Sequence, residues 1–131
     1  MEELVRQARV AHLATVREAD LVDLVPITFA LDGDLLHTAV DHKPKSTRAL
    51  RRLDNVRRNP AVTVLIDHYD DDWSTLWWVR LRGTARVHDG GPALDRAVDA
   101  LVEKYPQYRG HRPEGPAIVI DIHEWAGWAA G

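Results

Sequence analysis

The chain has 131 residues with 17 basic and 20 acidic side chains, which gives a formal net charge of −3. This length suits one domain, expected to span 1–131, with a small core. The sequence has no cysteine, which excludes disulfides, thiolate metal sites and a cysteine nucleophile. No apolar run approaches the ~20 residues that span a bilayer, and the amino terminus lacks an apolar signal segment. We therefore expect a soluble, cytoplasmic protein with no membrane partner.

The first third of the chain predicts one short helix followed by strands. Apolar residues at helical spacing favour a helix over 2–9, and β-branched and alternating apolar residues favour strands over 10–16, 22–31 and 35–40. The pair Asp32-Gly33 between the last two strands is a strong hairpin signal. Because proline donates no ladder hydrogen bond, we expect the sheet to be interrupted at Pro26.

A basic stretch over 41–59 contains seven lysines and arginines and predicts an amphipathic helix. Pro44 blocks an earlier start, Ser46 or Thr47 can cap the helix, and Asn59-Pro60 ends it. Helical spacing separates an apolar face from a polar, mostly cationic one. The apolar face holds Ala49, Leu50, Leu53 and Val56, and the opposite face holds Arg48, Arg51, Asn55 and Arg58.

The second half of the chain predicts strands over 61–67, 77–87 and 116–122, and a helix over 94–105 that Pro106 stops. Strand 77–87 has the clearest period of two. Gly83 within it indicates a β-bulge or a close backbone approach. The inward face of this strand is expected to carry Trp77, Val79, Leu81, Gly83, Ala85 and Val87.

The order of these elements predicts the fold class. Strands that alternate apolar and polar positions, joined by short turns, favour an antiparallel sheet. About six such strands, with helices in mid-chain and late, predict a mainly β (α+β) protein. We expect a small split β-barrel with peripheral helices.

The basic helix suggests an anion site. Backbone N–H groups at a helix start favour anions, and Lys45, Ser46 and Thr47 add donors there. Arginine binds phosphate and carboxylate bidentately, so the face with Arg48, Arg51, Asn55 and Arg58 could also serve. An ordinary helix cap and a solvated charged face explain the same residues. A nucleic-acid partner is disfavoured because the patch is short and the chain is net acidic.

Other site chemistry lacks a pattern in this sequence. His42, His68 and the acidic segment 67–72 have no paired metal-ligand spacing, so we expect no metal site. No Gly-x-Ser-x-Gly motif or serine–histidine–acid arrangement supports hydrolase chemistry. We name no catalytic side chain.

Four motifs in order carry a family resemblance. They are Val-Pro-Ile-Thr-Phe at 25–29, Thr-Ala-Val-Asp-His-Lys-Pro-Lys-Ser at 38–46, the segment 51–67 from Arg-Arg-Leu-Asp-Asn to Val-Leu-Ile-Asp, and the tryptophan-rich segment 71–87. Together they resemble the pyridoxamine-phosphate-oxidase-like split β-barrel superfamily. The last motif is similar to the branch of that superfamily that uses the deazaflavin coenzyme F420 in place of FMN.

The resemblance implies a homodimer with the cofactor in a groove between protomers. The ring would lie against Val25, Pro26, Ile27 and Thr28, and the phosphate would meet the turn at Lys45, Ser46 and Thr47 and the helix behind it. One departure from the family pattern is Ala19-Asp-Leu-Val-Asp23, where relatives carry a glycine and a small polar pair. Among the tryptophans, Trp77 is expected in the core, and Trp73 and Trp78 at a pocket or dimer surface. The expected cofactor contacts also include Thr38, Arg51, Asn55 and Trp78.

The implied activity is an F420-dependent oxidoreductase that moves hydride between the reduced deazaflavin and a small unsaturated or electron-poor substrate. In such a protein the cofactor carries the chemistry and the protein binds and orients it. Two alternatives stay open: an FMN-binding relative, and a non-catalytic F420 carrier.

Overall fold

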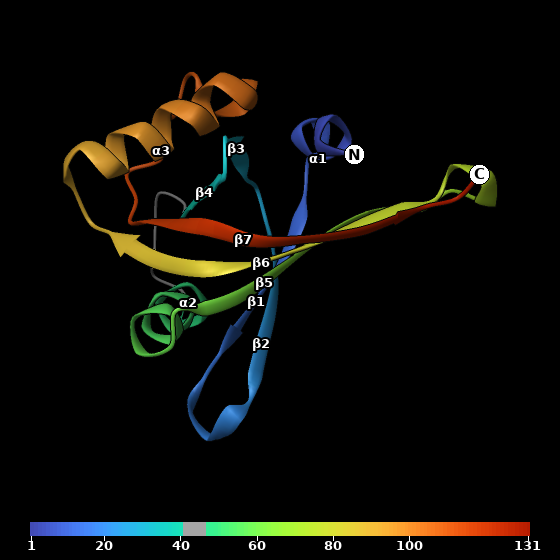
Figure 1. Cartoon of the computed structure of the whole chain (residues 1–131). Helices are drawn as coiled ribbons and strands as arrows, with labels where there is room; N and C mark the ends of the chain where they lie inside the picture. The colour runs from blue at the N-terminus through green and yellow to red at the C-terminus, as the bar shows by residue number, and fades with distance from the viewer. Residues whose placement is uncertain (41–46) are drawn as a thin grey trace.

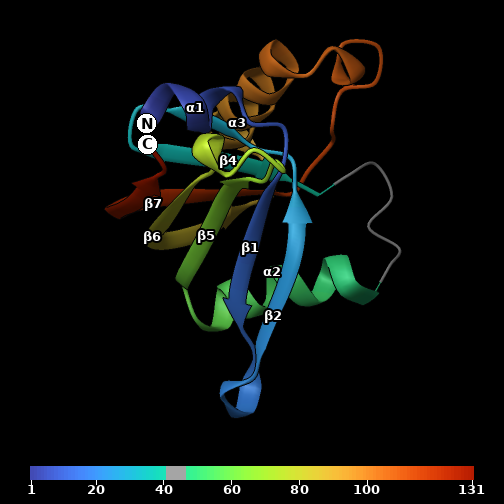
Figure 2. The ribbon, with the colours of Figure 1, turned by 90° about the vertical axis from the view of Figure 1, so that its right-hand side faces the viewer.

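The computed structural model describes residues 1–40 and 47–131, apart from the side chains of 47–49. The described residues form one curled antiparallel sheet of seven strands in the order β2-β1-β5-β6-β7-β4-β3 (Figures 1 and 2). This arrangement confirms the predicted split barrel. The strands are β1 Ala11–Val16, β2 Val22–Ile27, β3 Ala30–Asp32, β4 Leu35–Ala39, β5 Ala61–His68, β6 Trp77–His88 and β7 Ala117–Ala129.

In the part of the chain that the structure describes, three α-helices lie around the sheet: α1 Glu2–Gln7, α2 Thr47–Arg58 and α3 Gly91–Lys104. In Figure 1, α2 and α3 lie on opposite sides of the layer formed by β5, β6 and β7. Helix α2 packs against β1 and β6, whereas α3 packs against β3 and β4. No helix in the described part of the chain has the length and apolar character needed to cross a bilayer.

The strand predicted over 22–31 is divided in two, which accounts for seven strands where about six were expected. The division is at Thr28 and Phe29, so the predicted interruption at Pro26 is wrong. Pro26 stands opposite His12 within β2. Because β2 is an edge strand, it can accommodate a residue that donates no ladder hydrogen bond.

The central strands β6 and β7 confirm the prediction for Gly83. A register shift occurs between Arg82 and Gly83 along this pair. A Cβ at Gly83 would collide with the carbonyl oxygen of Asp121 and lie 2.8 Å from Ile120 Cγ2. The close approach of β7 therefore requires glycine. Strand β7 itself extends to Ala129, beyond the predicted end at residue 122, because its second half pairs with the start of β6.

Inward-facing side chains of the strands build the core, as the period of two predicts. Leu53 and Val56 of α2 join this core, which includes Leu13, Phe29, Val64, Ile66, Leu81, Ile118 and Ile120. The predicted division of α2 into two faces is partly wrong. Leu50 is 48% exposed, whereas Asn55 is 1% exposed and lies on the side that meets the sheet.

Candidate functional site

A small cavity lies between β2 and α2, and we call it the β2–α2 cavity. Its volume is about 180 Å³. It forms where the edge strand β2, paired on one side with β1, leaves a space beside the helix. The lining residues are Thr15, Asp23, Leu24, Val25, Arg51 and Arg52.

Asn55 joins the helix to the strands beside this cavity. Its side-chain nitrogen donates to Thr15 Oγ1 at 3.0 Å and to Asp23 Oδ2 at 2.8 Å. The other carboxylate oxygen of Asp23 lies 3.7 Å from Arg17 Nη1. Because the side-chain nitrogen of Asn55 already has two acceptors, Asn55 holds the wall of the cavity together in this arrangement. The hydrogen bond that it donates also partly balances the charge of Asp23.

Arg52 is the most constrained cation of the β2–α2 cavity. Its side chain is half-buried, and its Nε has no hydrogen-bond partner in the described part of the chain. Burial lowers the pKa of Arg52 from its ordinary value. A buried donor without a partner is costly, so this guanidinium is suited to an anion that enters the cavity beside the exposed Arg51.

A second cavity, of about 540 Å³, adjoins the break between β2 and β3. We call it the tyrosine cavity, because Tyr105 and Tyr108 line it together with Arg9, Thr28, Pro106 and Gln107. The hydroxyl groups of Thr28 and Tyr108 are 2.9 Å apart. The hydroxyl of Tyr105 accepts from the backbone N–H of Phe29 at 3.1 Å and donates to the Arg9 carbonyl at 2.8 Å. These contacts hold the chain where it leaves β2.

A third cavity, of about 600 Å³ and mostly apolar, contains Trp78 and Trp128, and we call it the tryptophan cavity. These two residues pair across β6 and β7. The Arg80 guanidinium lies 5.9 Å from the centre of the Trp78 ring. The remaining lining residues are Thr63, Leu65, Asp67, His68, Tyr69, Leu76, Trp77 and Arg80.

The tryptophan cavity opens on the outer face of the sheet, defined here by Val22, Leu24, Pro26, Leu65, Trp78 and Trp128. Strand pairing places these residues on one side: Pro26 is opposite His12, which is opposite Leu65, and Leu65 is opposite Arg80. Val22 and Leu24 are 61% and 66% exposed, and Trp128 is 48% exposed. Exposed apolar residues gathered on one face indicate a contact surface.

The predicted cofactor residues fall into separate groups. The structure brings Val25 and Arg51 together in the β2–α2 cavity, with Asn55 in its wall. Thr28 lines the tyrosine cavity and Trp78 the tryptophan cavity. Pro26 is exposed on the edge strand, and Ile27 is buried.

The remaining predicted cofactor contacts are either buried or lie outside the residues that the structure describes. Thr38 of β4 is 1% exposed and stands opposite Ile118 of β7. It lines none of these cavities. Helix α2 begins at Thr47, whose side chain is outside the described residues, as are Lys45 and Ser46.

Sequence reasoning did not assign Arg52, Tyr105 or Tyr108 to a site, although the structure places all three at these cavities. The sequence predicts Tyr105 only as the last residue of the helix over 94–105, although a tyrosine hydroxyl usually has a hydrogen-bond partner when it is buried. Two tyrosines flanking a helix-ending proline could have indicated the tyrosine cavity. No sequence signal separates Arg52 from the other arginines of α2.

The described residues contain no candidate metal site. Within 1–40 and 47–131, no three His, Asp or Glu side chains are grouped so that they could hold a metal ion. The hydrogen-bond donors that line the β2–α2 and tyrosine cavities are guanidinium, hydroxyl and amide groups, which suit an organic anion.

Comparison with known proteins identifies the family. Residues 1–129 match the family model for pyridoxamine 5'-phosphate oxidase, and the chain belongs to that family. The match covers nearly the whole chain and agrees with the split barrel that the structure shows. A comparison with curated protein sequences gives no match.

Several solved structures have the same fold at low sequence identity. A candidate 5-nitroimidazole antibiotic resistance protein from Bacteroides thetaiotaomicron has a TM-score of 0.72 and 15% identity, with 96% of this chain and 80% of that chain covered. A FAD-binding protein from Mesorhizobium loti has a TM-score of 0.69 and 18% identity, covering 96% and 89%. A heme binding protein from Mycobacterium smegmatis has a TM-score of 0.76 and 16% identity, covering 96% and 51%. At these identities the likeness concerns the fold.

Proposed function

We propose that the protein is a coenzyme F420-dependent oxidoreductase of this family. It would transfer hydride between the reduced deazaflavin and a small unsaturated or electron-poor organic substrate. The observation that carries the proposal is that Arg51, Val25 and the half-buried Arg52 line one cavity, and that Arg52 Nε has no hydrogen-bond partner in the described part of the chain. This cavity lies beside the helix that follows the expected phosphate turn at Lys45 and Ser46.

The charge of the β2–α2 cavity favours a ligand with several negative charges. Arg51 and Arg52 supply two cations. Among the described lining residues the one carboxylate is Asp23, which already accepts a hydrogen bond from Asn55 and lies near Arg17. Coenzyme F420 carries a phosphate and an oligoglutamate tail, whereas FMN carries the phosphate without that tail. The additional arginine therefore favours the deazaflavin.

The size of the β2–α2 cavity supports a homodimer. Its volume of about 180 Å³ is below the roughly 300–1,000 Å³ typical of sites for ligands of cofactor size. A second copy of this chain could complete the site by docking its outer face, where Leu24, Trp128 and their neighbours leave apolar surface exposed. In this arrangement Trp78 and the tryptophan cavity of one protomer would face the cofactor of its partner.

The side chains would bind and orient the cofactor without forming a covalent bond to it. Arg51 and Arg52 would hold the acidic end, and the backbone of β2 from Val25 to Ile27 would meet the ring edge. Thr28, fixed by Tyr108, sets the direction in which the chain leaves that strand. When bound, the deazaflavin would supply the hydride chemistry, and solvent could supply the proton.

A fluorescence titration of the purified protein with coenzyme F420, FMN, FAD and haem tests the cofactor. FAD and haem belong in this panel because the proteins of known structure with this fold include a FAD-binding and a heme binding protein. We expect the tightest binding for coenzyme F420. Micromolar binding of FMN without binding of coenzyme F420 would show that the cofactor assignment is wrong.

Turnover separates an enzyme from a carrier. Reduced coenzyme F420 would be incubated with the protein and with quinones, nitroaromatics including a 5-nitroimidazole, and enones. The nitroaromatic is chosen because one solved structure of this fold is a candidate 5-nitroimidazole resistance protein. Oxidation of the deazaflavin with at least one acceptor supports an oxidoreductase, and tight binding with no oxidation supports the carrier.

Variants locate the site. Lys45→Ala and Arg52→Met should each weaken cofactor binding by about 1–3 kcal/mol if each side chain makes a charge-assisted contact with the ligand. Arg57→Met is the matched control, because Arg57 is exposed on the same helix and already pairs with Asp54 and Asp89. If Lys45→Ala and Arg52→Met bind the cofactor as tightly as Arg57→Met and the parent protein do, Lys45 and Arg52 do not belong to the site.

A further inference from the structure

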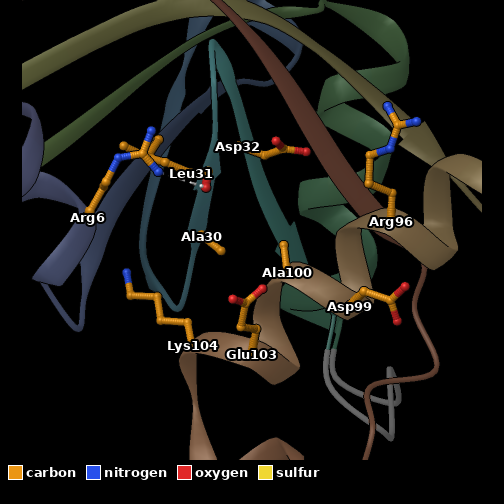
Figure 3. A pocket seen from close by; sticks show the side chains of 9 residues that line it. All are labelled: Arg6, Ala30, Leu31, Asp32, Arg96, Asp99, Ala100, Glu103 and Lys104. Atoms are coloured by element: carbon orange, nitrogen blue, oxygen red, sulfur yellow. Dashed lines mark hydrogen bonds between the residues drawn. The ribbon is translucent and has the colours of Figure 1, made fainter.

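A fourth cavity, of about 520 Å³, lies apart from the residues assigned to the cofactor. It is bounded by Arg6 of α1, by residues 30–32 of β3 and by one face of α3 between Arg96 and Lys104, and we call it the α1–α3 cavity (Figure 3). It shares no lining residue with the β2–α2, tyrosine or tryptophan cavities.

Lys104 brings an unpaired cation to this cavity. Its Nζ is buried, lies 3.8 Å from the centre of the Phe29 ring, and has no hydrogen-bond partner in the described residues. Burial and the nearby Arg9 lower the pKa of Lys104 to about 8. The contact with the ring compensates the ammonium only in part, because a cation–π contact is weaker than a hydrogen-bonded ion pair.

The other charges of the cavity divide into paired and unpaired groups. Asp99 is paired with Arg112 at 2.6 Å, and Arg6 with Glu2 at 3.1 Å. Glu103 and Arg96 have no ion-pair partner among the described side chains. Asp32 lies 3.5 Å from His37, but burial lowers the pKa of that histidine, which disfavours its charged form.

Two unpaired cations and two uncompensated carboxylates therefore line one cavity. A simple anion would be repelled by Glu103 and Asp32, and a simple cation by Lys104 and Arg96. A ligand with one charge of each sign meets both kinds of group. Figure 3 shows Lys104 and Glu103 reaching from α3 toward β3, with Arg6 approaching from α1.

We propose that the α1–α3 cavity binds a free α-amino acid, with its carboxylate at Lys104 and its ammonium at Glu103. Lys104 and Glu103 both line the cavity from α3, so groups of opposite charge border one space, as the two charges of an α-amino acid require. In this proposal the Lys104 ammonium, which lies 3.8 Å from the centre of the Phe29 ring, would turn from the ring toward the bound carboxylate. Ala30 and Ala100 are small, and they leave room for the ligand's side chain.

Calorimetry on the purified chain, without cofactor, tests the binding. The probes are glycine, L-glutamate and L-lysine, with acetate and methylammonium as single-charge controls. We expect millimolar or tighter binding of at least one amino acid and none of the two controls. Absence of amino-acid binding overturns the proposal, as does equal binding of acetate, which would indicate an adventitious ion only.

Variants place the bound amino acid. Lys104→Met and Glu103→Gln should each weaken its binding by about tenfold or more, as expected for loss of a charge-assisted contact. Arg86→Met and Glu114→Gln, at exposed positions outside the cavity, should leave the affinity unchanged. Affinity equal to that of the parent protein in both cavity variants would rule the site out. Thermal unfolding shows whether each variant is folded. If Lys104→Met does not fold, Glu103→Gln tests the site on its own.

A second readout follows the lysine directly. In an NMR titration of the Lys104 side chain, saturation with the amino acid should raise its pKa above the value of about 8, because a carboxylate stabilises the ammonium. No change on saturation would place the ligand elsewhere. Since neither experiment uses a cofactor, failure here leaves the proposed oxidoreductase function untouched.

Discussion

The side-chain amide of Asn55 in helix α2 donates a 2.8 Å hydrogen bond to the carboxylate of Asp23 in strand β2. The same nitrogen donates to Thr15 of β1 at 3.0 Å. One buried amide thus ties the helix to two strands at the wall of the β2–α2 cavity. The geometry of that cavity depends on this side chain.

Replacing Asn55 with alanine should lower the free energy of unfolding by about 2 kcal/mol, because two acceptors lose their donor and Asp23 loses a charge-assisted contact. Urea unfolding measures the change. Asp54→Ala on the same helix, where the side chain is exposed, should change the free energy by less than about 0.5 kcal/mol. Similar effects of the two substitutions would contradict the structural role of Asn55.

Gly83 should not tolerate a side chain. In Gly83→Ala the added Cβ would meet the Asp121 carbonyl oxygen and Ile120, and overpacking against a backbone cannot be relieved by a rotamer change. We expect a loss of about 1–3 kcal/mol or more in the free energy of unfolding. Gly110→Ala is the control, since nothing lies within 4 Å of that Cβ position. A stable Gly83→Ala protein would mean that β6 and β7 are farther apart than described.

Ala19 offers a stabilising substitution. Its φ of 64° places a residue with a Cβ in the left-handed region. Ala19→Gly removes that steric cost and should raise the free energy of unfolding by about 1 kcal/mol. In Ala14→Gly the same change within β1 should instead destabilise the protein by about 0.5–1 kcal/mol. If Ala19→Gly also destabilises, the backbone at residue 19 is not left-handed in solution.

Lys104 should make stability depend on pH. Its pKa of about 8 in the folded protein is below the ordinary value of 10.5, so between these values the unfolded chain binds more protons. The free energy of unfolding should therefore gain a rising contribution as the pH increases from about 8 toward 10. Burial raises the pKa of Tyr105, which acts in the opposite direction but only near and above its ordinary value of 10.0.

Urea unfolding at several pH values between 8 and 9.5 tests this contribution, because that window lies below the titration of Tyr105. The difference in slope between the parent protein and Lys104→Met isolates the lysine. Lys104→Gln, which removes the charge and keeps a polar end, should lose the same slope. Identical pH profiles for all three proteins would show that the lysine titrates normally.

Much of the fold follows from local pattern. The period of two over 77–87 predicted the central strand β6, because alternate side chains of a strand point to opposite faces. Asp32-Gly33 predicted the β3–β4 hairpin, which closes between Asp32 and Leu35. The need for glycine at residue 83 was also visible, since a glycine inside such a regular strand indicates close approach of another backbone.

Long-range contacts decided the rest. Helical spacing placed Asn55 with the arginines and Leu50 with the core, but Asn55 finds its partners 40 and 32 residues earlier in the chain, which reverses the expected burial. The break at Thr28 depends on hydroxyl groups of Tyr105 and Tyr108, almost 80 residues later. The motifs named the family, whereas the four cavities arise only where distant elements meet. A sequence pattern records what each residue prefers locally, and only packing determines which polar groups face one another.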